Sequence, residues 1–131
     1  MEKKDLAVLV IEDDEDVASL LHTILKRSGF NPDLAESEAE GMNLVSRKSF
    51  DIIFSDTYCN GIPYGPRIVL KARELGQNPK IIANSGDANG IAEWKDLNPD
   101  YFFRKPLDIR EIRVTMDSIY ESVKKTKAES S

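Results

Sequence analysis

Two apolar runs that each end in carboxylates constrain the fold of this chain more than any other feature. The run of residues 6–11 is followed by three acids, and the mostly apolar run 51–55 leads directly into Asp56. Continuous apolar runs of this length are typical of strands that are buried on both faces of a parallel sheet. The carboxyl ends of such strands form the edge at which open parallel sheets bind ligands. The sequence therefore predicts a cluster of carboxylates at a ligand-binding edge.

Strand-like and helix-like segments alternate along the chain, which is the pattern of a parallel sheet with helical crossovers. The predicted strands cover about residues 7–11, 31–35, 51–55, 80–84 and 101–103. The predicted helices cover about residues 15–28, 38–47, 66–75, 91–97 and 109–124. Right-handed crossovers place helices on both faces of the sheet and give a three-layer α/β sandwich. A chain of this size typically takes the flavodoxin-like strand order 2-1-3-4-5, in which the first and third strands are neighbours.

Two of the predicted helices carry a clear apolar stripe at helical spacing. In the first helix the stripe contains Val17, Leu20, Leu21, Ile24 and Leu25. In the last helix it contains Ile109, Ile112, Met116, Ile119 and Val123. We expect residues 1–131 to form a single domain, with a folded core over about 5–124 and a disordered tail over 125–131.

Charge and composition argue against several classes of function. The formal net charge is −5. Because proteins that bind a nucleic-acid backbone normally carry a basic patch, we expect no direct binding of nucleic acid. The single cysteine, Cys59, excludes an internal disulfide and suits a reducing compartment. No apolar run approaches the roughly 20 residues that span a bilayer, and the N-terminus lacks the apolar segment of a signal peptide. We therefore expect a cytoplasmic protein that makes no membrane contact.

Two further strand ends bring a hydroxyl and an ammonium group to the same edge of the predicted sheet. The strand 80–84 ends at Ser85, and the strand 101–103 is followed by Lys105. Carboxylates that are packed at one edge repel one another, and a divalent cation relieves that repulsion. Hard oxygen ligands select Mg²⁺, or Mn²⁺, rather than zinc. The pattern therefore predicts a magnesium site at this edge.

Glu12, Asp13 and Asp56 are the candidate ligands of this cation. A carboxylate in the place of Asp56 can also attack phosphorus, as it does in aspartyl-phosphate enzymes. Lys105 would then balance the charge of the phosphoryl oxygens, and Ser85 would donate a hydrogen bond to one of them. Each residue alone has an ordinary structural explanation, such as turn formation by an aspartate after a strand. Their coincidence at one edge favours an aspartyl-phosphate site.

The strand-end segments together resemble the receiver domain of two-component response regulators, which has a CheY-like flavodoxin fold. The segments that carry the resemblance are 8–14, 52–56, 81–86 and 102–106. The resemblance implies that Asp56 accepts a phosphoryl group from a sensor histidine kinase or a phosphotransfer protein. It implies that Asp13 binds Mg²⁺ directly, that Glu12 binds it mainly through water, and that Asp56 binds it through its second oxygen. The backbone carbonyl of Tyr58 would complete the protein ligands.

The resemblance also implies a conformational switch. Ser85 takes the role of the switch hydroxyl, Lys105 that of the family's conserved lysine, and Phe102 that of the switch aromatic. The peptide bond between Lys105 and Pro106 is expected to be cis. Phosphorylation would bias the face made by the fourth helix, the fifth strand and the fifth helix, where a downstream protein effector binds. The resemblance leaves open whether phosphorylation also drives homodimer formation.

The segment after Asp56 departs from the family pattern. Receiver domains usually have a Met-Pro pair in this segment and a glycine eight residues after the phosphoacceptor. Here the pair is absent and Gly65 lies nine residues after Asp56, so the loop is predicted to be one residue longer. The bulky side chain of Tyr58 is predicted to cover the acyl phosphate and to slow self-dephosphorylation.

Two other functions fit parts of the sequence. The altered loop is compatible with a degenerate receiver that binds partners without phosphorylation. The spacing of Asp14 and Asp16 matches the Asp-x-Asp motif of haloacid-dehalogenase-type phosphatases, which would make the protein a Mg²⁺-dependent phosphatase. The favoured prediction is a receiver that is not a conventional enzyme, because it catalyses only its own phosphorylation and dephosphorylation.

Overall fold

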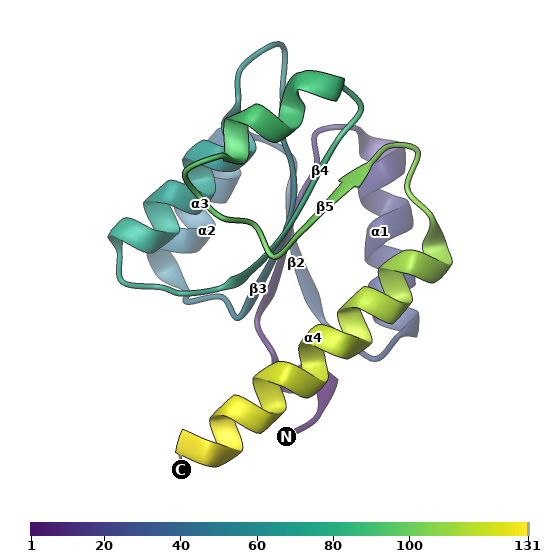
Figure 1. Cartoon of the computed structure of the whole chain (residues 1–131), viewed down its shortest axis with the longest axis vertical. Coiled ribbons are helices and arrows are strands. Elements are labelled where there is room, and N and C mark those ends of the chain that lie inside the picture. Colours follow the sequence, from purple (N-terminus) through teal and green to yellow (C-terminus); the bar gives the residue numbers. More distant parts are fainter. Residues whose placement is uncertain (131) are drawn as a thin grey trace.

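In the computed structural model, which describes residues 1–130, a five-stranded parallel sheet forms the middle layer (Figure 1). The strands are β1 (Val8–Ile11), β2 (Pro32–Ala35), β3 (Ile52–Asp56), β4 (Lys80–Ser85) and β5 (Tyr101–Arg104). They lie in the order β2-β1-β3-β4-β5, and all neighbouring pairs are parallel. This order confirms the flavodoxin-like topology predicted from the alternation of strands and helices.

Helices cover both faces of the sheet (Figure 1). The α-helices are α1 (Glu15–Arg27), α2 (Glu38–Arg47), α3 (Tyr64–Glu74) and α4 (Ile109–Ser130), and the 3-10 helices are η1 (Lys3–Asp5) and η2 (Ala88–Trp94). One face is covered by α1 and α4, and the other by α2 and α3 together with η2. The three layers therefore match the predicted α/β sandwich. Within residues 1–130, none of the helices is both long enough and apolar enough to cross a bilayer.

The central strands are buried on both faces. In β1, Val8 and Val10 pack in the core beside α1 and α4, whereas Leu9 and Ile11 pack in the core beside α2 and α3. This alternation confirms that the first apolar run is a strand without a solvent-facing side. One member of the predicted stripe of α1 differs, because Leu20 is 50% exposed. Leu20 lies at the margin of the apolar face of α1, which is narrower than the sequence pattern indicates.

The segment after β4 also differs from the prediction. The sequence predicts an α-helix over about 91–97, whereas the structure has the 3-10 helix η2 at Ala88–Trp94. Gly90 lies directly against the side chain of Ser85, and a Cβ at this position would overlap the Ser85 hydroxyl. The side chain of Asp87 caps the start of η2 by accepting a hydrogen bond of 2.8 Å from a backbone N–H. These contacts begin the helical segment earlier, so the predicted fourth helix corresponds to η2 and the predicted fifth helix to α4.

The C-terminal helix is longer than predicted. The sequence predicts that it ends near residue 124 and that 125–131 are disordered, whereas α4 continues to Ser130. Residue 131 lies outside the described residues. The last turns of α4 contain Lys, Thr, Ala, Glu and Ser but no Gly or Pro. Because Lys, Ala and Glu favour helix and nothing in these turns breaks it, the helix extends past the end of its apolar stripe.

Close packing between β3 and the first turn of α3 requires a glycine. At Gly65 a Cβ would overlap the backbone carbonyl oxygen of Asp56 and would lie 2.5 Å from the hydroxyl oxygen of Ser55. Backbone atoms at the end of a central strand cannot shift without disturbing the sheet. The glycine that lies nine residues after Asp56 therefore allows α3 to begin directly beneath that carboxylate.

We predict that Gly65→Ala lowers the free energy of unfolding by about 3 kcal/mol, because the new methyl group overpacks against the strand backbone. Gly86→Ala is the matched control, since a Cβ there would lie 4.0 Å from the Lys105 side chain, which is ordinary contact. Urea denaturation followed by the fluorescence of the buried Trp94 measures both. Equal stability of the two variants would contradict the close packing of α3 on β3.

Candidate functional site

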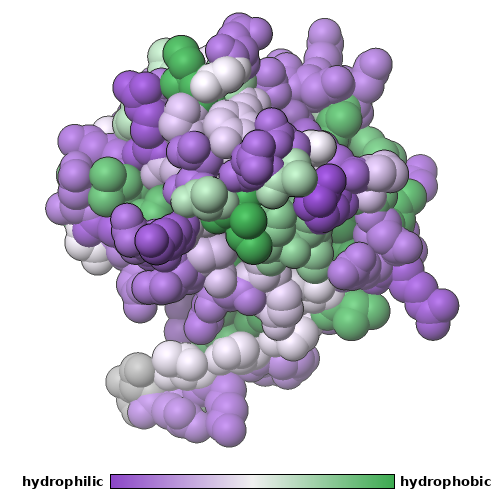
Figure 2. Space-filling model, turned by 45° about the horizontal axis from the view of Figure 1, so that its top comes forward, coloured by the Kyte–Doolittle hydropathy of each residue, from purple (hydrophilic) through white to green (hydrophobic). Residues whose placement is uncertain are grey.

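The predicted site residues converge at the carboxyl edge of the sheet. A pocket of about 660 Å³ at this edge is lined by Glu12, Asp13, Asp14, Asp56, Tyr58, Gly61, Ser85, Gly86, Asp87 and Lys105. With this edge turned forward, the molecular surface is mostly hydrophilic, and hydrophobic side chains form separate patches (Figure 2). The pocket therefore presents charged and polar groups, which suit a small charged ligand rather than an apolar one.

Three carboxylates form a tight cluster in this pocket. Glu12, Asp13 and Asp56 each offer a carboxylate oxygen, and these oxygens all lie within 4.8 Å of one another. Strand register explains the cluster, because Ile11 of β1 pairs with Ser55 of β3 and the acids follow directly after this pair. Glu12 and Asp56 are buried, whereas Asp13 is exposed. Such a cluster can hold a hard divalent cation.

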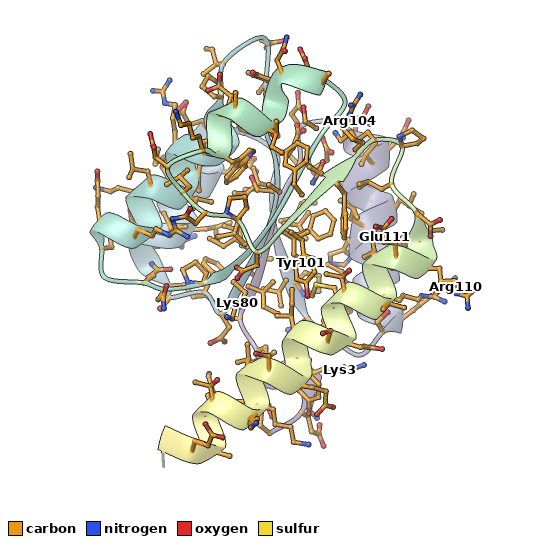
Figure 3. The ribbon with its side chains drawn as sticks, in the orientation of Figure 1. Lys3, Lys80, Tyr101, Arg104, Arg110 and Glu111 are labelled. Atoms are coloured by element: carbon orange, nitrogen blue, oxygen red, sulfur yellow. The ribbon has the colours of Figure 1, made fainter. Side chains whose placement is uncertain are left out.

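Lys105 connects the two buried carboxylates. Its Nζ lies 2.6 Å from Oε1 of Glu12 and 3.2 Å from Oδ1 of Asp56. Strand β5 runs upward from Tyr101 to Arg104, toward the carboxyl edge, and so delivers the following lysine to the pocket (Figure 3). The N–H of Lys105 donates a hydrogen bond of 3.0 Å to the carbonyl of Ser85. The peptide bond to the next residue, a proline, is cis, as the family resemblance implies.

Burial and like charge perturb the acids of the cluster. Burial raises the pKa of Glu12 to about 7, and the nearby charge of Asp56 adds to this rise, while the hydrogen bond from Lys105 opposes it. Burial likewise raises the pKa of Asp56, against the opposing charge of Lys105. A single ammonium group therefore does not fully offset the desolvation and repulsion of the two buried carboxylates.

Ser85 is buried at the end of β4 and faces the start of η2. Its Oγ accepts a hydrogen bond of 3.0 Å from the N–H of Asp87, and its side chain packs against Gly90. Phe102, the predicted switch aromatic, is half-buried and packs against the core beside α2 and α3. The structure thus brings Ser85 into the pocket lining, whereas Phe102 packs against the core and does not line the pocket.

A buried tryptophan that sequence reasoning missed connects η2 to the residue after Asp56. Trp94 Nε1 donates a hydrogen bond of 2.8 Å to Oγ1 of Thr57, and this hydroxyl donates one of 2.8 Å to the carbonyl of Asn84. Trp94 has no exposed surface. The only hint of this role in the sequence is that the single tryptophan of the chain lies shortly after the fourth predicted strand.

The loop after β3 forms a small hairpin. Cys59 and Ile62 exchange two backbone hydrogen bonds of 2.9 and 3.0 Å, and the two residues between them have positive φ angles. Tyr58 lies at the pocket rim before this hairpin, and its hydroxyl donates a hydrogen bond of 3.2 Å to Glu93 of η2. The metal-binding role of the Tyr58 carbonyl stays a prediction.

Tyr64 also reaches the carboxylate cluster, although sequence reasoning assigned it no role. Its hydroxyl lies 3.1 Å from Oδ2 of Asp56 and 3.5 Å from Oδ1 of Asp13. The sequence predicts a helix that begins at residue 66, which leaves Tyr64 in the preceding loop, whereas α3 begins at Tyr64 itself. The only hint of this contact in the sequence is that Tyr64 directly precedes Gly65. The structure shows that this glycine packs on Asp56.

The fold is similar to that of solved receiver domains. The Francisella response regulator 1452 receiver domain matches with a TM-score of 0.77 at 21% identity, and the match covers 91% of this chain and 99% of that one. A CheY-like response regulator receiver domain from Methylobacillus flagellatus matches with a TM-score of 0.75 at 26% identity, over 87% of this chain and 98% of that one.

The sequence comparison decides the family. The family model described as "Response regulator receiver domain" matches residues 8–117. The chain belongs to the response regulator receiver family. Receiver domains of this family act in two-component signalling. One relative of this receiver is sporulation initiation phosphotransferase F of Bacillus subtilis (strain 168), with 25% identity over 108 residues, which is 81% of this chain and 86% of that protein.

A second relative of the receiver is a longer protein. The response regulator ArlR of Staphylococcus aureus is 26% identical over 113 residues, which is 86% of this chain and 51% of ArlR. The chain therefore spans about half the length of this relative.

We predict that the metal-free receiver loses stability as pH rises from about 4.5 to about 7. The pKa of Glu12 is raised from 4.5 to about 7 in the folded state, so between these values the unfolded chain has released a proton that the folded protein still holds. The free energy of unfolding should fall by roughly 3 kcal/mol across this window.

Urea denaturation at several pH values in the presence of EDTA measures this slope. The variant Glu12→Gln cannot titrate at this position, so its stability should change much less over the same window. A slope of equal size in both proteins would show that Glu12 is not the group that holds the extra proton.

Proposed function

We propose that this receiver accepts a phosphoryl group onto Asp56 in the presence of Mg²⁺, from the phosphohistidine of a sensor histidine kinase or a phosphotransfer protein. The observation that carries the proposal is the ion pair of 3.2 Å between Lys105 Nζ and Asp56 Oδ1, inside a pocket that Asp56 shares with two other acids. Asp56 thus has a fixed ammonium group at one carboxylate oxygen and two further acids nearby. This arrangement suits a phosphoryl acceptor that needs a metal ion.

The residues present fit a magnesium ion. Their side-chain donors are carboxylate oxygens, and the raised pKa values of Glu12 and Asp56 reflect burial and repulsion that a divalent cation relieves. We propose that Asp13 and Asp56 bind the ion directly, that Glu12 binds it mainly through water, and that the Tyr58 carbonyl is a further ligand. When bound, Mg²⁺, or Mn²⁺ in its place, neutralises charge on the transferred phosphoryl group.

The chain's own residues would perform the transfer as follows. A carboxylate oxygen of Asp56 attacks phosphorus, and the new O–P bond forms as the N–P bond of the phosphohistidine breaks. The departing imidazole keeps the electron pair of that bond. Lys105 balances charge on the phosphoryl oxygens, and Ser85 rotates its hydroxyl away from the η2 loop to donate a hydrogen bond to one of them. The receiver thereby modifies itself and turns over no separate substrate.

We propose that η2, β5 and α4 form the face that responds to phosphorylation. Ser85 contacts both Asp87 and Gly90 at the start of η2, so a rotation of its hydroxyl would remove contacts from that helix. Phe102 of β5 lies in the same region of the fold and is our candidate for the switch aromatic. Arg110 and Glu111 project from the first turn of α4 and offer charges to a partner (Figure 3). The partner at this face is a downstream effector or a second copy of the receiver.

The phosphatase alternative is not favoured by the local structure. Oδ1 of Asp14 accepts hydrogen bonds of 3.0 and 3.1 Å from the N–H groups of Asp16 and Val17. The Asp-x-Asp spacing therefore serves as the N-cap of α1, which is an ordinary structural role. The degenerate receiver alternative predicts that the acidic pocket binds no phosphoryl group, and the following experiment separates it from the proposal.

We predict that incubation with acetyl phosphate adds the mass of one phosphoryl group to the protein only when Mg²⁺ is present. Asp56→Asn should show no gain under the same conditions, because an amide is not a nucleophile toward phosphorus. Intact-protein mass spectrometry measures both. Turnover of general phosphate esters would instead indicate a phosphatase. The absence of any mass gain in the wild-type protein with Mg²⁺ would indicate a degenerate receiver.

We predict that Tyr58→Asn shortens the lifetime of the phosphorylated protein about tenfold, which corresponds to a barrier lower by ~1.4 kcal/mol. The Tyr58 ring lies at the pocket rim and is held there by the hydrogen bond to Glu93, so it limits the approach of water to the acyl phosphate. Release of inorganic phosphate after removal of the phosphodonor measures the lifetime. Identical release rates for both proteins would show that the ring does not shield the site.

A further inference from the structure

The hydroxyl of Tyr64 lies between two of the carboxylates that the proposed metal would use. It is 3.1 Å from Oδ2 of Asp56 and 3.5 Å from Oδ1 of Asp13. A phenol has one proton, so the shorter contact is the main hydrogen bond and the longer one is at most shared. The two oxygens of Asp56 therefore have different partners, because Oδ1 faces the ammonium group of Lys105.

This hydroxyl cannot retreat from the cluster. Tyr64 is only 1% exposed, and its ring is part of the apolar core beside α2 and α3. Its backbone is fixed as well, because its N–H donates a hydrogen bond of 2.8 Å to the carbonyl of Ile62 and the next residue, Gly65, packs on the backbone of Asp56. Removal of the ring from its site would open a large cavity in the core.

The phenol remains protonated and so acts as a donor. Burial, followed by the charge of Asp56, raises the pKa of the Tyr64 hydroxyl above its ordinary value. A neutral phenol places the partial positive charge of its proton toward the carboxylate oxygen that it contacts. Hydrogen bonds to an ionised acceptor are stronger than those between neutral groups. Tyr64 thus supplies Asp56 with a small, permanent positive partner at Oδ2.

We propose that Tyr64 is a positioning residue that takes the place of the cation at Asp56 in the metal-free protein, and that it sets the metal affinity of the pocket by competing for Oδ2. This inference rests on the proposed function, since it concerns the same carboxylates. A divalent cation between Asp13 and Asp56 repels the hydroxyl proton that points at them. In this proposal, each binding event breaks the hydrogen bond between Tyr64 and Asp56, while the buried ring keeps the hydroxyl nearby.

The competition has two consequences for the receiver. Without metal, Asp56 stays oriented by Tyr64 at one oxygen and by Lys105 at the other, so the acceptor carboxylate is held in one position before a phosphodonor arrives. With the hydroxyl as a competitor, the metal site is weaker than its three carboxylates alone would make it. Occupancy of the site then responds to the concentration of Mg²⁺ instead of being permanently saturated.

Isothermal titration of the full chain with MgCl₂ tests the proposal. Tyr64→Phe keeps the ring and removes only the hydroxyl, so we expect it to bind Mg²⁺ about tenfold more tightly than the wild type. Tyr120→Phe is the matched control, because it also removes a buried tyrosine hydroxyl, one that donates to the carbonyl of Met1 (2.7 Å) and lines no part of the pocket. Its Mg²⁺ affinity should equal that of the wild type.

An unchanged affinity in Tyr64→Phe would overturn the proposal. A weaker affinity would overturn it as well, because it would mean that the phenol oxygen acts as a metal ligand. If neither protein binds Mg²⁺, the proposal falls together with the metal part of the proposed function.

A measurement on the wild-type protein tests the same competition independently of whether Tyr64→Phe folds. In protein labelled with ¹³C at the tyrosine ζ carbon, the Tyr64 resonance should shift as Mg²⁺ is added, because the phenol loses its carboxylate acceptor. A resonance that does not respond to saturating Mg²⁺ would contradict the competition. Phosphorylation by acetyl phosphate separates the two claims, since a receiver that gains its phosphoryl group but shows no Tyr64 effect refutes this inference alone.

Discussion

Repulsion among carboxylates at the ends of β1 and β3 is the constraint that shapes the rest of the site. Parallel pairing of these strands in register places Glu12 and Asp56 side by side, and both are buried. Lys105 lies within hydrogen-bond distance of both, and loss of its ammonium group would leave two uncompensated buried charges. The raised pKa of Glu12 nevertheless indicates that one ammonium group is not enough. The pocket therefore retains a capacity for further positive charge.

A change of charge at this pocket would reach η2 through short contacts. Thr57, the residue after Asp56, holds Trp94 of η2 by a hydrogen bond, and Ser85 packs directly on Gly90 of the same helix. Both contacts involve groups that are buried and closely packed, so neither hydroxyl can turn without altering its neighbour. The carboxylate pocket and the 3-10 helix η2 are therefore adjacent and linked by these two contacts.

The parts of the site that follow from strand ends could be predicted from the sequence. Each apolar run that ends in an acid, a serine or a lysine fixes a strand and the residue after it, and parallel pairing then brings those residues to one edge. The positions of Glu12, Ser85 and Lys105 in one pocket needed no further information. The cis peptide after Lys105 followed only from the family resemblance, because sequence alone does not separate the two isomers.

The parts that depend on tertiary packing could not be predicted. The helix after β4 begins at residue 88 because Gly90 fits against Ser85, and a periodicity argument has no means of detecting that contact. The role of Trp94 depends on a hydrogen bond to a hydroxyl 37 residues earlier in the chain. Leu20 matches the apolar pattern of α1 but lies half in solvent, since the pattern does not report how wide the covered face is.

The loop between β3 and α3 positions two tyrosines near Asp56. Its hairpin, closed by Cys59 and Ile62, turns through two residues with positive φ angles. It leaves Tyr58 at the rim of the pocket and returns the chain so that Tyr64 starts α3 beneath Asp56. Gly65 then fixes the distance between that helix and the strand. The segment from Tyr58 to Tyr64 therefore brings one phenol to the pocket rim and a second to Oδ2 of Asp56, while Lys105 contacts Oδ1 of the same carboxylate.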